Sequence, residues 1–385
     1  MWRLAIFFIV LWQISSVRLL AGELIDPGKG KLSDDRATRW FDLRVLDIEG
    51  QGWREMKAPF DRLPAKAEGK VRDAVWGLSR QSAGLCARFE TDASSIKAKW
   101  TLTSANLAMP HMPATGVSGL DLYVRSEDGF WRWLANGRPT AQTNEANLAG
   151  NIPPNRRPNT KREFLLYLPL YNGVSSVEIG LPAAATLMTA DPYRNEDGSA
   201  RKPIIFYGTS ITQGGCASRP GMVHTAILQR KLEHPVINLG FSGNGKMEPE
   251  VVNFIAEIDA SCFVIDCLPN IEAREVAERT EPLVHSLRKA WPKTPILLVE
   301  DRTYSDAFLI ESKRDRNESS RHAFHSAHQR LLGDGVKHLF YLEGDFLLGS
   351  DNEGTVDSSH PTNLGFLRQA DAFEQILRPI LFPEE

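Results

Sequence analysis

The segment that decides the fold is Pro203-Ile204-Ile205-Phe206-Tyr207-Gly208-Thr209-Ser210-Ile211-Thr212-Gln213-Gly214. Its apolar run predicts a short buried strand that ends in a glycine turn, with a serine at the tip. In an open α/β sheet this end of a strand faces the crevice where ligands bind. Ser210 is therefore a candidate nucleophile, which would need a base and an oxyanion hole. The alternative is a turn serine whose hydroxyl satisfies backbone amides.

Strands and helices alternate from this segment to the C-terminus. Short apolar runs predict strands at 203–207, 235–238, 262–266, 295–300 and 336–341. Helical patterns lie between and after them at 223–232, 249–258, 273–290, 319–332 and 364–377. This order predicts a five-stranded parallel sheet covered by helices on both faces, a flavodoxin-like three-layer α/β/α fold.

A candidate base lies far downstream in Asp357-Ser358-Ser359-His360-Pro361. An aspartate three residues before a histidine can fold back on one turn and accept the proton of Nδ1. Nε2 is then free to take a proton from a hydroxyl. Pro361 predicts that the last helix starts at this point. An ordinary solvated histidine in a surface loop is the alternative.

Two later strand ends offer donors for an oxyanion. The second strand runs into a glycine-rich loop, where the amide of Gly243 could face a substrate. The third strand runs into Asn270, whose side-chain amide could donate to the same oxyanion. A flexible loop and a turn asparagine are the alternatives. All these positions fall on one edge of the predicted sheet.

Four more residues are candidates for the substrate pocket: Thr209, Asn244, Glu300 and Asp301. Asn244 is also the alternative oxyanion donor. Glu300 and Asp301 end the fourth strand, where they could orient substrate or form a structural ion pair. No metal is expected, because the helical histidines near position 325 have no carboxylate partner at a familiar spacing.

The order and context of Ser210, Gly243, Asn270 and His360 resemble the SGNH, or GDSL-type, hydrolases. The resemblance implies that Ser210 is the nucleophile, His360 the base and Asp357 the acid that orients it. It implies that the amides of Ser210 and Gly243 and the side chain of Asn270 form the oxyanion hole. Thr209 departs from the family, which usually has Asp there, and Asn270 lacks the usual Gly before it and Asp after it.

The first half of the chain predicts a different architecture. Short alternating runs between about 40 and 181, separated by glycine and proline turns, predict an all-β sandwich of jelly-roll type. Gly119-Leu120-Asp121-Leu122-Tyr123 resembles the Gly-x-Asp-Leu-Tyr region of a β-domain that precedes some SGNH hydrolases. We expect a signal peptide at 1–22, the β-sandwich at 23–188, a linker at 189–202 and the hydrolase domain at 203–385.

Composition narrows the class of protein. The chain has 385 residues and a formal net charge of -3, with no basic stripe, so nucleic-acid binding is not expected. Arg3 followed by a short apolar run predicts a cleaved signal peptide, hence export and no stable membrane span. Four cysteines in so long a chain do not make a disulfide framework.

Together these features predict an exported serine esterase. It would remove short acyl groups, acetyl above all, from a carbohydrate or small polar substrate through an acyl-enzyme, without a cofactor. The carbohydrate comes from the resemblance and from export. Two alternatives stay open, an acyltransferase using the same site and a non-catalytic glycan-binding protein. The oligomeric state is open as well.

Overall fold

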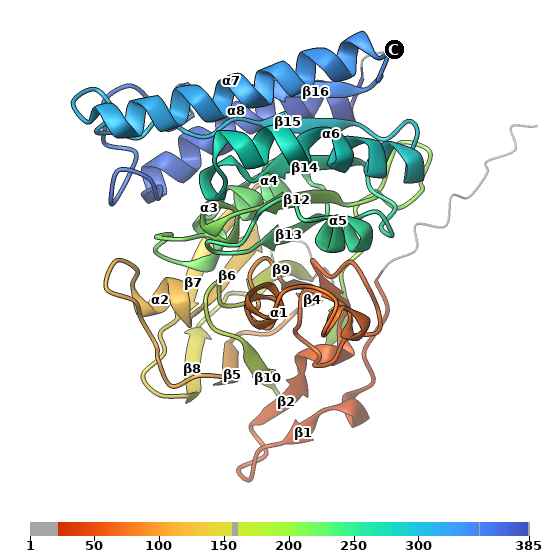
Figure 1. Cartoon of the computed structure of the whole chain (residues 1–385). Coiled ribbons are helices and arrows are strands. Elements are labelled where there is room, and N and C mark those ends of the chain that lie inside the picture. Colours follow the sequence, from red (N-terminus) through yellow and green to blue (C-terminus); the bar gives the residue numbers. More distant parts are fainter. Residues whose placement is uncertain (1–21, 156–160, 346, 384–385) are drawn as a thin grey trace, which may run out of the picture.

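The computed structural model describes residues 22–155, 161–345 and 347–383, in two lobes stacked on each other (Figure 1). The predicted signal peptide lies almost entirely outside these residues. The lower lobe is antiparallel, as its alternating sequence predicts. The upper lobe is a parallel sheet between helices.

Two antiparallel sheets form the lower lobe. The first has the order β1 (Lys31–Leu32), β2 (Thr38–Asp42), β10 (Val174–Pro182), β5 (Ile96–Leu102), β8 (Thr143–Ala149). The second has the order β11 (Leu187–Thr189), β4 (Cys86–Thr91), β9 (Arg162–Tyr167), β6 (Leu120–Arg125), β7 (Trp131–Gly137), with β3 (Ile48–Glu49) paired to β4. Alternate residues such as Trp100 and Phe164 point between the sheets into a common core. The predicted sandwich is confirmed.

The second sheet is buried on both faces. In β9, Phe164 and Leu166 pack into the sandwich core, whereas Leu165 and Tyr167 pack against the upper lobe. The hydroxyl of Tyr167 donates to the backbone oxygen of Ala226, 3.2 Å away in a helix of that lobe. The two lobes therefore share one hydrophobic core.

The upper lobe is the predicted five-stranded parallel sheet. Its order is β13 (Val236–Gly240), β12 (Ile204–Gly208), β14 (Cys262–Asp266), β15 (Ile296–Val299), β16 (Leu339–Leu342). The interior strand β12 sends Ile204 and Phe206 to one face and Ile205 and Tyr207 to the other. Both faces are therefore buried, and the strand reads as a continuous apolar run.

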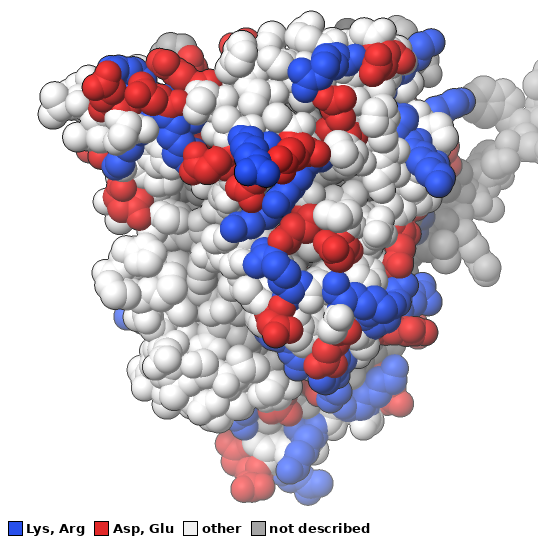
Figure 2. Space-filling view, viewed as in Figure 1, with Lys and Arg blue, Asp and Glu red and all other residues white. Residues whose placement is uncertain are grey.

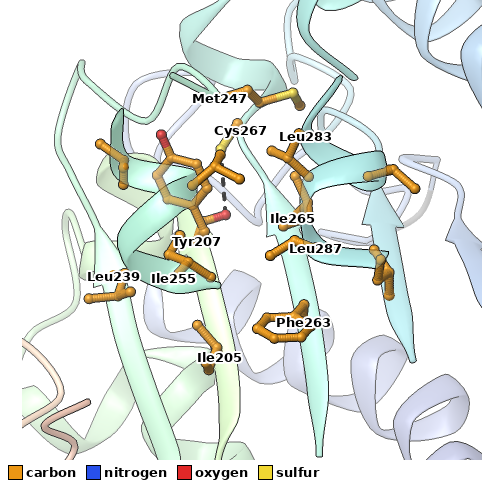
Figure 3. Packing of buried hydrophobic residues seen from close by; sticks show 14 of the residues in the cluster. Ile205, Tyr207, Leu239, Met247, Ile255, Phe263, Ile265, Cys267, Leu283 and Leu287 are labelled. Carbon is orange, nitrogen blue, oxygen red and sulfur yellow. Dashed lines mark hydrogen bonds between the residues drawn. The ribbon is translucent and has the colours of Figure 1, made fainter. Parts of the chain in front are cut away.

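Helices cover both faces of this sheet. One face packs against α5 (Pro249–Ile255), α6 (Ala273–Ala290) and α7 (Glu311–Gly333), and the other against α4 (His224–Leu232) and α8 (Asn363–Leu381). Figure 3 shows Tyr207 and Ile265 of the sheet against Ile255 of α5 and Leu283 of α6. The thiol of Cys267 donates there to the backbone oxygen of Tyr207, 3.5 Å away.

Some predicted boundaries are wrong. α8 begins at Asn363 with Thr362 as its N-cap, so Pro361 is not its first residue and instead bridges to Thr355. α7 begins at Glu311, eight residues before the predicted start at 319. The first turns of α7, residues 311–318, are entirely polar, so they carry no apolar periodicity.

Candidate active site

The turn after β12 carries the candidate nucleophile. Ser210 is the first residue of α3 (Ser210–Gln213), and the hydroxyl of Thr209 caps that helix by accepting from Ile211 N. A Cβ on Gly208 would lie 2.0 Å from Thr212 Oγ1, so only glycine allows a turn this tight. The side chain of Ser210 is thereby held at the start of a helix, with 8% of the residue exposed.

Ser210, His360 and Asp357 form a chain of hydrogen bonds. Ser210 Oγ lies 2.8 Å from His360 Nε2, and His360 Nδ1 lies 2.8 Å from Asp357 Oδ2. A proton on Nδ1 donated to the carboxylate leaves Nε2 as the acceptor for the serine hydroxyl. The structure thus brings Ser210 to a histidine that stands 150 positions later in the sequence, with Asp357 three residues before that histidine.

The loop 355–361 is shaped to hold the histidine. Ser358 has a φ of 73°, which turns the chain back on itself, and Val356 N donates to the carbonyl of His360 at 2.8 Å. Asp357 Oδ1 also accepts from the backbone N–H of His360 at 2.8 Å. One carboxylate therefore fixes both the backbone and the ring of His360.

Hydrogen bonds keep Asp357 ionised. Burial alone would raise the pKa of its carboxyl, but bonds from the backbone and ring of His360, with a further one from Ser359 N, hold that pKa below its ordinary value. A carboxylate that stays charged stabilises the imidazolium that forms when His360 takes a proton.

Two candidate donors follow β13 and β14, the strands on either side of β12. Gly243 follows β13, is exposed and has a φ of 68°, with open space where a Cβ would stand. Within the described part of the chain, no protein acceptor is found for the backbone N–H of Gly243 or Ser210. Asn270 follows β14 in a short 3-10 helix, Leu268–Asn270, and its Oδ1 accepts from Gly245 N at 3.2 Å. That bond leaves the Nδ2 donor of Asn270 available.

The alternative donor, Asn244, is already engaged. Its Nδ2 donates to the carbonyl of Ser242 at 2.8 Å, and its Oδ1 accepts from Arg72 at 2.8 Å. Arg72 is in turn paired with Glu248. Asn244 therefore braces the glycine-rich loop, and the geometry favours Asn270 as the oxyanion donor.

Three predicted pocket residues are buried and bonded within the protein. Thr209 is fully buried, and its hydroxyl is used as the helix cap. Glu300 accepts from Tyr341 Oη at 2.6 Å and from Gly344 N at 2.8 Å. Asp301, only 2% exposed, pairs with Arg316 at 2.6 Å. The carboxylates of Glu300 and Asp301 therefore have their hydrogen-bond partners inside the protein. This fits a structural role, the alternative to orienting substrate.

Arg316 connects Asp301 to the oxyanion side of the site. Besides its bond to Asp301, its guanidinium donates to the carbonyls of Leu268, Pro269 and Ile271 at 3.1–3.2 Å. These carbonyls surround Asn270 in the chain. Arg316 lies in the polar first turns of α7, where the sequence carries no signal for such a clamp.

The lower lobe also reaches the nucleophile, which sequence reasoning missed. Tyr171, in the loop between β9 and β10, donates its hydroxyl to the carbonyl of Ser210 at 3.2 Å. The ring of His111, before α2 (Ala114–Val117), lies 5.9 Å from the ring of His360, centroid to centroid. Both residues precede the predicted linker, so spacing within the upper lobe could not reveal them.

The described residues contain no group of three or more His, Cys, Asp or Glu placed to hold a metal ion. The same part of the chain has no helix long and apolar enough to cross a membrane. All four cysteines are free and buried. Burial is the main cause that raises the pKa of the Cys216 thiol to about 12.

Two family models match the chain, one for each lobe. Residues 201–378 match the GDSL-like lipase/acylhydrolase family. Residues 38–187 match the GxDLY domain, described as the N-terminus of SGNH hydrolase-type esterases. No curated protein matches the chain.

Solved structures resemble both lobes together. A protein from Bacteroides ovatus ATCC 8483, described as a GDSL-like lipase, is 34% identical with a TM-score of 0.82, over 89% of this chain and 98% of that one. A salicylyl-acyltransferase of a tetracycline biosynthetic pathway has a TM-score of 0.69 at 18% identity, over 90% and 99% of the two chains. A family two carbohydrate esterase from Clostridium thermocellum, in complex with cellohexaose, has a TM-score of 0.55 at 13% identity, over 77% and 95%. The last two show a shared fold.

Proposed function

Because the chain belongs to the GDSL-like lipase/acylhydrolase family and is an esterase, we propose that it is an exported serine esterase that removes short acyl groups, acetyl above all, from a carbohydrate. The single observation that carries the mechanism is the hydrogen-bonded series Ser210, His360 and Asp357. Candidate oxyanion donors follow the two strands that pair with β12, which supports the proposal.

The proposed reaction has two halves. Ser210 Oγ attacks the ester carbonyl while His360 Nε2 takes its proton, and the carbonyl oxygen becomes an oxyanion. The amides of Ser210 and Gly243 and the Nδ2 of Asn270 donate to that oxyanion. The tetrahedral intermediate collapses, the ester C–O bond breaks, and His360 gives its proton to the leaving alcohol.

Water then resolves the acyl-enzyme by the same route. His360 takes a proton from water as it attacks the acyl carbonyl, and returns that proton to Ser210 Oγ as the acid leaves. Asp357 stays ionised throughout and holds the imidazolium in place. No step in this scheme requires a metal or an organic cofactor.

Support for the substrate and the location comes from outside the triad. A carbohydrate esterase with this fold was solved with cellohexaose, which favours a sugar ester. The charged start and short apolar run at the N-terminus favour export. Acetyl is the acyl group we propose, since an acetyl xylan esterase from the rumen bacterium Butyrivibrio proteoclasticus has the same fold, with a TM-score of 0.52 at 11% identity.

The experiment is acetate release from a panel of acetylated oligosaccharides, with p-nitrophenyl acetate as the simple ester. We expect Ser210→Ala to lower kcat on both by about 10⁴-fold or more, because the nucleophile is lost. The fold should survive, as measured by circular dichroism and the melting temperature. Near-wild-type turnover by a folded Ser210→Ala protein would refute the mechanism.

Acyl transfer is the second candidate function, favoured by the fold shared with a salicylyl-acyltransferase. The same acyl-enzyme could pass its group to an acceptor alcohol instead of water. Product analysis with a range of sugar and aromatic alcohols as acceptors separates the two. Hydrolysis that dominates at millimolar acceptor supports the esterase, and transfer that dominates supports this alternative.

A further inference from the structure

A groove in the lower lobe opens next to the nucleophile. Its cavity of ≈ 790 Å³ lies between the loop 103–110, the end of α1 (Asp73–Ser79) with Arg80 and Gln81, and the loop 171–173. The volume falls in the range of about 300–1,000 Å³ that is usual for small-molecule sites. The second family model covers all the residues that line it.

Tyr171 joins this groove to the catalytic centre. It lines the groove, and its hydroxyl donates to the carbonyl of Ser210 at 3.2 Å. The loop 103–110 continues into His111, whose ring neighbours that of His360. A single side chain, that of Tyr171, therefore links one end of the groove to Ser210.

The groove is preorganised by a buried asparagine. Asn172, 2% exposed, accepts from Ser104 N at 3.1 Å and from Thr103 Oγ1 at 3.2 Å. Its amide nitrogen donates to the carbonyl of Ser104 at 2.9 Å and to Ser118 Oγ at 3.1 Å. These bonds fix the loop before any ligand arrives, which lowers the entropy cost of binding.

The groove has a mixed polar and apolar lining and carries no free charge. Residues 100–120 contain no Lys, Arg, Asp or Glu. The surface over α2 and the preceding loop is almost free of charged side chains in Figure 2, at the left of the lower lobe. The one cation in the lining, Arg80, is paired with Asp61 at 2.6 Å and lies over the ring of Trp76.

The exposed lining offers neutral hydrogen-bonding groups. Asn106 lines the groove with an exposed side-chain amide, for which the described residues supply no recorded partner. Ser104 and Thr103 lie beside it, and their hydroxyls already bond to Asn106 N and to Asn172 Oδ1. A long acyl chain would leave the amide of Asn106 desolvated and unpaired, whereas a hydroxyl-rich ligand would satisfy it.

From this placement and chemistry we infer that the groove binds the uncharged sugar units of the substrate's alcohol part, next to the ester held at Ser210. The inference rests on the proposed function, because it names where that same site takes its carbohydrate. It makes the lower lobe a part of substrate recognition. It also predicts that an acetylated oligosaccharide is a better substrate than an acetylated single sugar.

The test fills the groove and compares substrates. Ala105 lines the groove and is exposed, so Ala105→Trp should obstruct it, and Asn106→Leu should remove its free amide. Ala184→Trp is the matched control, since Ala184 is equally exposed but lies in the turn between β10 and β11. For each protein, kcat/KM is measured on acetylated tetrasaccharides of glucose, xylose and mannose and on the matching acetylated monosaccharides. The simple esters p-nitrophenyl acetate and p-nitrophenyl octanoate are measured beside them.

We expect the ratio of kcat/KM on the best tetrasaccharide to that on p-nitrophenyl acetate to fall at least tenfold in Ala105→Trp, mainly through KM. A smaller fall in the same direction is expected for Asn106→Leu, and no change for Ala184→Trp. In a Ser210→Ala background, calorimetry should show that Ala105→Trp also weakens binding of the unacetylated tetrasaccharide. This binding measurement is independent of turnover.

Three results would overturn the inference. If the wild type acts on acetylated tetrasaccharides and both groove variants keep its ratio, the sugar lies elsewhere and the proposed function survives. If p-nitrophenyl octanoate, and not the tetrasaccharide, is selectively lost in Ala105→Trp, the groove takes the acyl chain. If the wild type cleaves no acetylated sugar at all, the proposed function fails and the inference fails with it.

Discussion

Replacing Asn270 by Asp separates two roles of this side chain. Asn270 Oδ1 accepts from Gly245 N at 3.2 Å, and Gly245 packs so tightly on the nucleophile turn that a Cβ there would lie 2.0 Å from the carbonyl of Gly208. Asp keeps an acceptor for Gly245 but loses the Nδ2 donor. Asn270→Ala loses both. If the side chain serves only to anchor the loop, Asp should work and Ala should not.

The magnitude follows from the chemistry of the oxyanion. Losing one side-chain donor of an oxyanion hole costs about 10²–10³-fold in kcat, or about 2.7–4 kcal/mol. Asp adds a negative charge close to the developing one, a repulsion of up to about 4 kcal/mol at an effective dielectric constant of 20. Asn270 is partly exposed, so water screens part of this repulsion. We expect Asp to lose at least as much as Ala, about 10³-fold.

The assay is steady-state kinetics on p-nitrophenyl acetate, with the melting temperature of each variant measured in parallel. KM should change little, because the donor acts mainly in the transition state. Asn244→Ala is the control and should keep kcat within a few-fold, since its amide already donates to Ser242. Asn270→Asp with more than a tenth of wild-type kcat, or a larger loss in Asn244→Ala, would refute the assignment.

Asp357→Asn should lower kcat/KM by about 10⁴-fold with the fold intact, because a neutral amide favours the wrong tautomer of His360; normal kcat/KM with a lower melting temperature would make Asp357 a loop residue only. His224 is fully buried among phenylalanines, and the described residues give its ring no hydrogen-bond partner, so burial, with a smaller effect of Arg302, holds its pKa well below the ordinary value. Below about pH 6.5 only the unfolded chain then binds this proton, so lowering the pH should lower the free energy of unfolding. The wild type should lose about 1.4 kcal/mol per pH unit more than His224→Phe, which lacks the imidazole. Parallel urea titrations of the two proteins between pH 5 and 8 check this, and identical slopes would contradict it. The four buried thiols, with the pKa of Cys216 raised to about 12, should not react with Ellman's reagent at pH 8 until the protein unfolds, and a fast-reacting thiol in the native protein would count against this packing.

Much of the upper lobe could be predicted because its signals are local. Each buried parallel strand reads as a short apolar run, and the turn at Ser210 is marked by glycines on both sides. The motif Asp357-x-x-His360 is one turn of chain, so its hydrogen bond needs no distant partner. The order of strands then places Ser210, Gly243 and Asn270 on one edge of the sheet.

The contacts that could not be predicted all join distant parts of the chain. Arg316 in a polar stretch of α7 clamps the carbonyls around Asn270, and nothing in the local pattern marks it. Glu300 and Asp301 looked like pocket residues because they end a strand at the catalytic edge. Their burial depends on partners 15 to 44 residues away, which sequence spacing does not reveal.

Residues of the lower lobe therefore also support the catalytic segments of the upper lobe. Arg62, in the first segment of the lower lobe, is fully buried and donates to the carbonyls of Asn238 and Gly240 at 3.2 and 2.7 Å. Gly240 is the last residue of β13, just before the loop that contains Gly243. Tyr171 holds the carbonyl of Ser210 from the same lobe. A lobe that braces the oxyanion loop, touches the nucleophile turn and shares a hydrophobic core with the sheet cannot move freely as a tethered module. The groove that this lobe carries next to Ser210 is consequently held at a fixed position relative to the triad. Recognition of an ester within a longer sugar chain requires such a fixed position.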